Sequence, residues 1–219
     1  MNFFGHATVA TRISADPRFV LGAMLPDFMT MAQVRLGTVA DTEVARGVAV
    51  HHETDRVFHA LPSFRAACGS ALVALEAEGV PRAAARAVGH VGSELLLDGL
   101  LSSDRGARRS YANALRVAVG ERLERQLVLR DGDDPSSVRT LLMRLQHAPI
   151  PDGYSDPQFV CDRLHAILAH RPRLALRAAD RAPVLRWLDR ARDHLEQECD
   201  AILAQLEGVN VQDGVQAAE

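Results

Sequence analysis

One apolar stretch of the sequence carries imidazole and carboxylate side chains at helical spacing. In residues 44–62 (VARGVAVHHETDRVFHALP), His51, Asp55 and His59 follow one another at intervals of four. On an α-helix these side chains lie within about 80° of one face, in line with apolar residues that we expect to face the core. Burying such groups is unfavourable unless they pair or hold a metal ion. This stretch therefore indicates a site for metal binding or proton transfer.

A second apolar stretch repeats the pattern. In residues 83–101 (AAARAVGHVGSELLLDGLL), His90, Glu94 and Asp98 also recur at steps of four, among alanine, valine and leucine. Neither polar column is stable in a core by itself, because its charges would lack partners. We therefore expect the two helices to pack side by side with their polar columns facing each other.

Further candidate groups occur in short motifs outside these two stretches. Asp27 stands among apolar residues in LGAMLPDFM, where a solvated acid would be unusual, and His6 interrupts the apolar start MNFFGHA. Just beyond the second stretch, the segment SSDRGARRS contains Arg105, Arg108 and Arg109. These arginines either line the mouth of a pocket, where they would bind phosphate or carboxylate, or form a solvated basic turn.

The combined set of candidates suits a divalent cation. Its members are histidines and acids without a thiolate: His6, Asp27, His51, Asp55, His90, Glu94 and Asp98, with His52 and His59 as neighbours. Mixed imidazole and carboxylate ligands suit Mn²⁺, Fe²⁺, Mg²⁺ or Zn²⁺, and the surplus of acids fits two metals, or one metal beside a catalytic acid or base. Each group taken alone is better explained as part of a buried polar network. The two columns together favour a metal-dependent hydrolase.

Composition describes an ordinary folded chain. The 219 residues are 47% hydrophobic and 24% charged, and the net charge of -3 gives no reason to expect nucleic acid as a partner. The three cysteines are far apart and are interpreted as reduced core residues. The N-terminus lacks the basic start of a signal peptide, and no stretch reaches about 18 uncharged apolar residues. We therefore expect a cytoplasmic protein without a membrane span.

The pattern of apolar residues predicts an all-α fold. It is helical along the chain and shows no useful alternation of period two. We expect a single multi-helix domain over residues 1–207, with the metal site between its central helices. A flexible C-terminal tail is expected over residues 208–219.

Proline and glycine set the expected helix ends. A helix that begins after Asp16 is expected to be brief because Pro26 interrupts it, and residues 37–42 are expected to form a turn. Residues 148–157 are expected to form a loop that acts as a lid or contacts a partner. Other helices are expected over residues 111–129, 158–170, 174–179 and 183–207.

Five motifs stand in a defined order along the chain: MNFFGHA, LGAMLPDF, HHETDRVFHALPSF, SELLLDGLL and YSDPQFVCDRLHAILAHRPRL. Together they resemble the acyl carrier protein phosphodiesterases, an all-α family distantly similar to HD-type metal phosphohydrolases. The likeness extends from Met1 to about Leu176. It implies an HD-like domain, Mn²⁺ as the expected metal, and hydrolysis of the phosphodiester that joins phosphopantetheine to a serine of acyl carrier protein.

The resemblance also implies roles for single residues. The positions that match polar positions of the family pattern are His6, Asp27, His51, Asp55, Glu94 and Asp98. Asp27 matches the essential acid of the family, whereas His90 has no clear counterpart. Three positions depart from the pattern: His52 replaces a basic residue, His59 an acid, and Gly99 a histidine. Because these positions flank the site, the resemblance supports the metal ligands better than the substrate.

Three hypotheses follow for the function. The first is a metal-dependent phosphodiesterase of acyl carrier protein or of another phosphodiester, in which Asp27 holds metal or water. Its substrate contacts would be Arg105, Arg108, Arg109, His52 and His59. The second is an HD-like hydrolase of a small phosphorylated metabolite or nucleotide. The third is a non-enzymatic helical interaction protein whose polar columns are structural.

Overall fold

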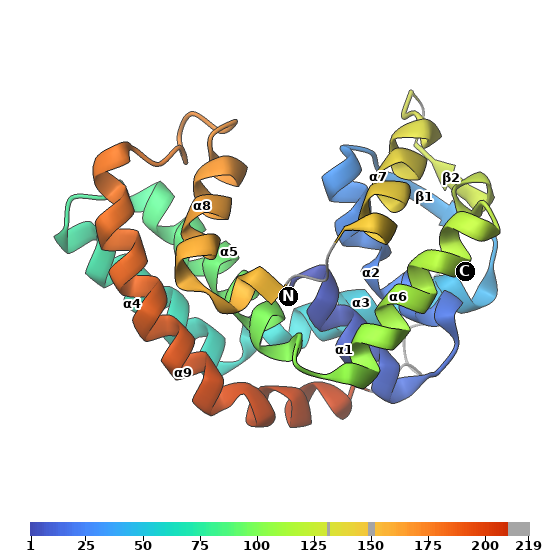
Figure 1. Cartoon of the computed structure of the whole chain (residues 1–219), viewed down its shortest axis with the longest axis horizontal. Helices are drawn as coiled ribbons and strands as arrows, with labels where there is room; N and C mark the ends of the chain where they lie inside the picture. The colour runs from blue at the N-terminus through green and yellow to red at the C-terminus, as the bar shows by residue number, and fades with distance from the viewer. Residues whose placement is uncertain (131, 149–151, 210–219) are drawn as a thin grey trace. The chain divides into compact units, whose positions relative to one another are not determined.

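The fold of the chain is all-α, as the sequence predicts. The computed structural model describes residues 1–130, 132–148 and 152–209, and helices make up nearly all of its regular structure (Figure 1). Within this described part, no single helix is both long and apolar enough to span a membrane. Two consecutive helices, Thr42–Ala60 and Pro62–Ala77, are long and apolar enough only when they are taken together, and the chain bends by 60° between them.

The chain divides into two compact units, each built from stretches that are distant in sequence. The first unit comprises Met1–Val57, Asp104–Ile150 and Gln205–Glu219, and the second comprises Phe58–Ser103 and Pro151–Ala204. The single domain over residues 1–207 stays a prediction. Most of the expected tail, residues 210–219, lies outside the described residues.

The first unit combines helices with one small sheet. Its elements are α1 (Phe3–Ile13), α2 (Pro17–Ala32), β1 (Leu36–Val39), most of α3 (Thr42–Ala60), α6 (Arg105–Gly120), the 3₁₀ helix η1 (Leu123–Gln126), β2 (Leu127–Leu129) and α7 (Pro135–His147). Aromatic rings of three helices meet in its core, where the ring of Phe3 lies 5.7 Å from that of Phe28 and 6.0 Å from that of Tyr111. This contact fixes α1 and α2, which carry His6 and Asp27.

The regular structure of the second unit is entirely helical in its described residues. Its elements are the end of α3, α4 (Pro62–Ala77), α5 (Arg82–Leu101), the 3₁₀ helices η2 (Asp152–Ser155) and η3 (Ala178–Asp180), α8 (Pro157–Leu168) and most of α9 (Arg181–Glu207). The fully buried Trp187 joins α9 to α4, because its indole N–H donates a hydrogen bond of 3.1 Å to the hydroxyl of Ser70.

An aspartate followed by proline starts three of these helices. Asp16, Asp134 and Asp156 are the N-caps of α2, α7 and α8, and each side chain accepts a hydrogen bond from the backbone N–H two residues further on. The proline that follows lacks an N–H that would be unpaired at this position anyway. An aspartate before a proline therefore predicts where these three helices begin.

The helix after Asp16 is longer than the sequence predicts. The expected break at Pro26 is wrong, because α2 continues through it to Ala32. Proline removes one hydrogen bond within the helix, but the helix is buried on both sides of it, and this packing outweighs the loss. Asp27 consequently projects from a continuous helix.

The backbones of α2 and α3 touch at a pair of glycines. A Cβ added at Gly22 or at Gly47 would lie 2.1 Å from a backbone carbonyl oxygen of the other helix. Neither position can carry a side chain without separating the helices. This close approach brings the carbonyl group of Ala23 next to the imidazole of His51.

Two expected elements of the first unit are wrong in part. The helix expected over residues 111–129 ends at Gly120, and Arg122 then takes a left-handed conformation with φ 54°. The chain continues as β2, which pairs antiparallel with β1 where a turn over residues 37–42 was expected. In β2 only the central Val128 is exposed, and an alternation over three residues is too short to recognise in the sequence.

The short helix expected over residues 174–179 is also wrong. Only η3 forms there, at Ala178–Asp180. Arg177 precedes it in an extended conformation, held by hydrogen bonds from its backbone N–H and guanidinium to the Asp180 carboxylate. This local pairing competes with helix formation.

Candidate metal centres

Three candidate residues from three helices come together in the first unit. One ligand atom each of His6 on α1, Asp27 on α2 and His51 on α3 lies within 4.8 Å of the others. We call these three residues the first cluster. Both imidazoles are buried, and their ring centroids are 3.9 Å apart. The sequence suggests all three as metal ligands, and the packing of the three helices unites them.

The ring of His51 is held in one tautomer. Its Nδ1 lies 2.9 Å from the carbonyl oxygen of Ala23, and because a carbonyl only accepts, Nδ1 must carry a proton. Burial, and next the charge of His6, lower the pKa of His51 from 6.5 to about 3. The ring is therefore neutral at physiological pH, and its lone pair is at Nε2, the atom that can bind a cation.

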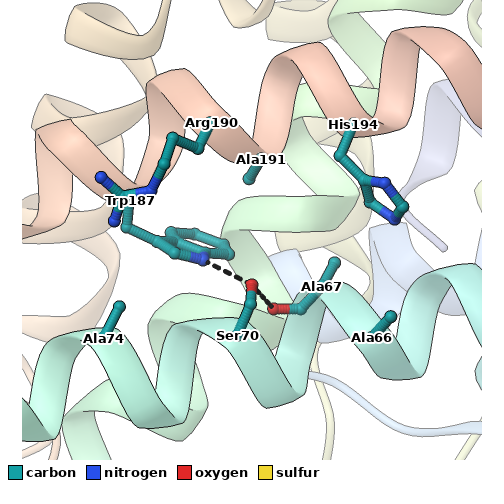
Figure 2. A pocket seen from close by; sticks show the side chains of 8 residues that line it. All are labelled: Ala66, Ala67, Ser70, Ala74, Trp187, Arg190, Ala191 and His194. Atoms are coloured by element: carbon teal, nitrogen blue, oxygen red, sulfur yellow. Dashed lines mark hydrogen bonds between the residues drawn. The ribbon is translucent and has the colours of Figure 1, made fainter.

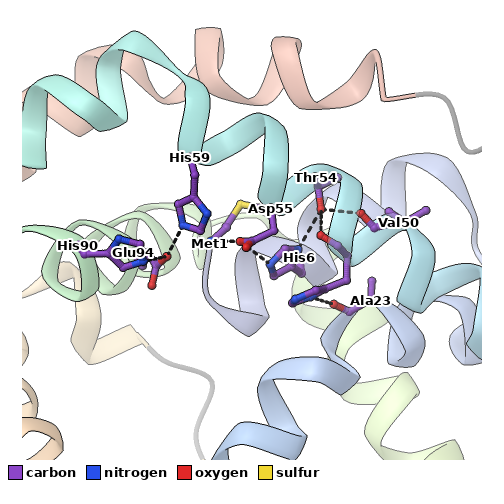
Figure 3. A network of polar contacts seen from close by, with 10 residues as sticks. Met1, His6, Ala23, Val50, Thr54, Asp55, His59, His90 and Glu94 are labelled. Carbon is purple, nitrogen blue, oxygen red and sulfur yellow. Dashed lines mark hydrogen bonds and ion pairs between the residues drawn. The ribbon is translucent and has the colours of Figure 1, made fainter. Parts of the chain in front are cut away.

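Thr54 fixes the ring of His6 in the same way. Its hydroxyl donates to the carbonyl oxygen of Val50 at 2.8 Å and lies 3.1 Å from Nδ1 of His6 (Figure 3). Because the hydroxyl hydrogen is already used, the oxygen accepts from Nδ1–H, which leaves the lone pair of His6 at Nε2. Outer partners of this kind orient histidines that bind metals.

Two more candidates lie beside the first cluster. The Oδ1 atom of Asp55 is 3.7 Å from Nε2 of His6 and 2.6 Å from the amino group of Met1, and its side chain is 32% exposed. His52 is exposed, and its ring meets that of His51 edge-on at 5.3 Å between centroids. Both residues therefore join the buried cluster to solvent.

A second group of candidates forms in the second unit. His59 at the end of α3 and His90 and Glu94 on α5 place ligand atoms within 4.8 Å of one another, and we call them the second cluster. Nε2 of His59 lies 3.0 Å and Nε2 of His90 lies 3.2 Å from the same oxygen, Oε1 of Glu94 (Figure 3). The sequence suggests His90 and Glu94 as metal ligands and His59 as a substrate contact, and the structure groups all three.

The carboxylate of Glu94 is kept ionised by its two imidazole partners. Burial by itself would raise the pKa of Glu94, but hydrogen bonds from His59 and His90 lower it well below its usual range. Phe64 of α4 packs against both rings, with centroid distances of 5.1 Å to His59 and 5.4 Å to His90. The second cluster is thus a fixed carboxylate between two braced imidazoles.

Asp98 lies where α5 meets η2. Its side chain is fully buried, and a Cβ added at the next residue, Gly99, would lie 2.1 Å from the backbone of Tyr154. The loop expected over residues 148–157 thus contains η2, which occupies the space that a side chain at position 99 would need. Burial raises the pKa of Tyr154, with Asp98 adding to the rise and Arg163 opposing it.

The three candidate arginines lie at the start of α6, in the first unit. The basic turn considered for this segment is instead a helix start, and the side chain of Asp104 caps it by accepting two backbone hydrogen bonds. Arg105 and Arg109 are exposed, and Arg108 is half-buried. Arginine at a helix N-terminus is a combination that binds anions well.

A cavity of about 330 Å³ lies between α4 and α9 of the second unit (Figure 2). Small residues form most of its wall, which comprises Ala66, Ala67, Ser70, Ala74, Trp187, Arg190, Ala191 and His194. No residue of either cluster lines it, so its volume alone does not mark it as the reactive site.

Two groups that shape the first cluster are not evident from the sequence. The Ala23 carbonyl carries no side-chain signal, and its role depends on the contact between α2 and α3. Thr54 gives a weak signal, because it follows His51 by three residues and so lies on nearly the same helix face.

The fold and donor atoms define a class of protein: an all-α chain with buried imidazole and carboxylate groups of the type that divalent metals bind. The family model described as acyl carrier protein phosphodiesterase matches residues 1–206. The chain therefore belongs to the acyl carrier protein phosphodiesterase family, as its motif order indicates, and this family is one of hydrolases. No curated protein and no solved structure gives a significant match.

Proposed function

We propose that this protein is a metal-dependent phosphodiesterase, related to the HD-type hydrolases, that releases 4′-phosphopantetheine from holo acyl carrier protein. Membership of the family supports the reaction class and the substrate. The metal dependence rests on one observation, the first cluster. There, two imidazoles with lone pairs at Nε2 lie beside the carboxylate of Asp27.

The donor set of the first cluster fits a divalent cation. His6 and His51 provide nitrogen and Asp27 provides oxygen, a combination that suits Mn²⁺, Fe²⁺ or Zn²⁺ better than the all-oxygen preference of Mg²⁺. We expect Mn²⁺, which the family resemblance implies. When bound, the cation supplies positive charge that polarises a phosphoryl oxygen and lowers the pKa of water.

Two carboxylates, those of Asp27 and Asp55, have separate roles in the proposed reaction. Asp27 provides the negative charge that holds the cation, or it accepts the proton of the attacking water from its partly buried position. Asp55 has contact with solvent and lies 3.7 Å from Nε2 of His6, so its carboxylate is close enough to add an oxygen ligand to a cation bound there.

Substrate contacts are expected from the exposed basic residues. Arg105, Arg108 and Arg109 combine side-chain charge with the N-terminus of α6, which suits the non-bridging oxygens of a phosphodiester or an acidic protein surface. His52 is exposed next to His51 and can contact the substrate from there.

A second candidate substrate, a different phosphodiester or a small phosphorylated metabolite, is favoured by the surroundings of Gly99. The family usually has a histidine at this position, but here the backbone of Tyr154 lies 2.1 Å from where its Cβ would be. The residues beside Asp98 therefore differ from the usual family pattern. If these residues contact the leaving group, the leaving group should differ as well.

The experiment that tests the proposal compares the wild type with Asp27→Asn. Chelator-treated protein is reloaded with Mn²⁺, Mg²⁺, Fe²⁺ or Zn²⁺ and assayed on holo acyl carrier protein and on a panel of other phosphodiesters and phosphomonoesters. We expect Mn²⁺ to support release of phosphopantetheine by the wild type, and Asp27→Asn to lower turnover by roughly 10²- to 10⁴-fold. The thermal midpoint should be unchanged or raised, because the amide is nearly isosteric and removes a partly buried charge.

The matched control is Asp189→Asn, which neutralises an exposed acid of α9 and should leave turnover unchanged. A purely structural role for Asp27 gives a different result: the variant loses about 3 to 5 kcal/mol of stability from a broken buried pair, and its folded fraction stays active. That outcome would overturn the catalytic role. Turnover without any added metal would overturn the metal dependence.

A further inference from the structure

We propose that His59, His90 and Glu94 form a second metal site, which binds Zn²⁺ or a similar transition cation independently of the first cluster. The proposal goes beyond phosphodiester hydrolysis, because it concerns a different donor set in the other unit of the chain. His59 and His90 are also positions at which this chain departs from the family pattern or has no clear match in it.

The separations of the donor atoms fit a tetrahedral cation. Zn²⁺ binds nitrogen and oxygen at about 2.0 to 2.1 Å in tetrahedral geometry, which places neighbouring ligand atoms about 3.3 Å apart. Oε1 of Glu94 already lies 3.0 Å from Nε2 of His59 and 3.2 Å from Nε2 of His90. These two distances are therefore within a few tenths of an ångström of the tetrahedral value, and all three ligand atoms lie within 4.8 Å of one another.

Proton positions can adjust without a change in net charge of the rings. When an imidazole of this cluster is neutral in the metal-free protein, it donates its Nε2–H to Glu94 and its Nδ1 holds the lone pair. Binding a cation at Nε2 moves that proton to Nδ1 of the same ring by exchange with water. Each imidazole thus keeps one proton, and Glu94 exchanges two hydrogen bonds for one bond to the metal.

Exposure and bracing both favour occupation of the site. The His90 side chain is 48% exposed, which gives ions a path to a carboxylate that is only 14% exposed. Phe64 packs on both rings and restricts their rotation, so less conformational entropy is lost on binding. Three protein ligands leave a fourth position for water or an anionic group, as in open zinc sites.

The test measures metal stoichiometry on chelator-treated full-length protein. Zn²⁺ is titrated calorimetrically, and Co²⁺ is used in parallel because its visible absorption reports tetrahedral coordination. The variants are His90→Ala and Glu94→Gln for the second cluster, His51→Asn for the first, and His170→Ala as an exposed control outside both. His90 is half exposed, so its replacement should leave the fold intact, which circular dichroism and the thermal midpoint verify.

We expect His90→Ala and Glu94→Gln each to lose the equivalent of Zn²⁺ and the tetrahedral Co²⁺ signal that belong to the second cluster. His51→Asn should keep these and lose only metal bound at the first cluster. Loss of a direct ligand should weaken binding by more than the roughly 10- to 100-fold that an outer partner contributes. The alternative is a hydrogen-bonded trio without metal affinity. Equal stoichiometry and affinity in the wild type and His90→Ala would establish that alternative and overturn the proposal, whatever the hydrolytic activity.

Discussion

The two clusters contain the same kinds of side chain but hold them in different ways. In the first cluster, Nδ1 of each imidazole faces an acceptor outside the cluster, a backbone carbonyl for His51 and a hydroxyl for His6. In the second cluster, the imidazoles direct Nε2 at the carboxylate of Glu94 itself. The first cluster is therefore set for a cation before one arrives, whereas the second must first give up its internal hydrogen bonds. Residue type alone does not distinguish these two states.

Charge follows the same division. His51 is buried and neutral, and burial stabilises that neutral form. Glu94 is mostly buried yet ionised, and its two imidazole partners offset the desolvation. In the first cluster, burial thus keeps the His51 imidazole uncharged, whereas in the second cluster hydrogen bonds from two imidazoles keep the Glu94 carboxylate charged. The two should differ in stability, in response to pH and in preference for cations.

The largest effect is expected from Gly47→Ala, which acts on the first cluster through the backbone. The new Cβ would lie 2.1 Å from the carbonyl oxygen of Phe19 and would force α2 away from α3. We expect a loss of about 3 kcal/mol in the free energy of unfolding, as for severe overpacking. The hydrogen bond between His51 and the carbonyl oxygen of Ala23 should weaken as well, so the first cluster should bind metal less tightly.

The control is Gly69→Ala on α4, where an added Cβ meets no atom within 4 Å. This substitution should stabilise the protein by about 0.5 to 1 kcal/mol, because alanine favours helix more than glycine does. Urea denaturation of both variants, with metal titration of each, makes the comparison. If Gly47→Ala were as stable as Gly69→Ala, the glycine contact would not be what positions the first cluster.

Most side chains of the first cluster can be predicted from the sequence, because they are polar residues within apolar segments. Polar groups at intervals of four among apolar residues reveal His51 and Asp55 on one helix, and isolated polar residues in apolar motifs reveal His6 and Asp27. The groups that hold the two imidazoles in place are harder to predict. A backbone acceptor such as Ala23 leaves no trace in residue type, and its position depends on how closely two helices approach.

The errors in the fold have a similar origin. Local rules predict a break at Pro26, but burial on both sides of it stabilises a continuous α2. The apolar spacing through Leu123 and Leu127 suits a helix, yet the chain leaves the helix at Gly120 and pairs β2 with β1. Pairing between segments that are about 90 residues apart is a tertiary effect, which local propensity does not contain.

An intermediate effect is expected from acid, and it distinguishes the clusters by pH. The pKa of His51 is lowered from 6.5 to about 3 in the folded protein. The unfolded chain therefore takes up a proton near pH 6.5 that the folded chain refuses. The stability is fully present above pH 6.5 and should fall by at most about 1.4 kcal/mol per pH unit below it, which is roughly 2 kcal/mol between pH 6.5 and 5.

The His51→Asn variant isolates this contribution, because its amide can still donate to Ala23 but does not titrate. Urea denaturation of metal-free protein should show a weaker loss of stability between pH 6.5 and 5 in the variant than in the wild type. Parallel curves for the two proteins in this range would contradict a neutral, buried His51.

The smallest effect is expected from Glu94→Gln in the second cluster. Its dependence on pH should appear in the range where carboxyl groups titrate, below that of His51. The pKa of Glu94 is lowered in the folded protein by its imidazole partners, against the effect of burial. Its charge therefore contributes stability above the usual carboxyl pKa of about 4.5, and this contribution is lost as the pH falls below that value. Glutamine keeps one acceptor oxygen but no charge, so we expect the metal-free variant to be less stable by about 1 to 2 kcal/mol at pH 7, the range of a hydrogen bond to a charged group. The difference between wild type and variant should shrink as the pH falls below 4.5, because the unfolded chain then takes up a proton that the folded Glu94 carboxylate refuses. A difference that stays unchanged down to pH 3 would contradict an ionised Glu94 whose pKa is lowered by its imidazole partners.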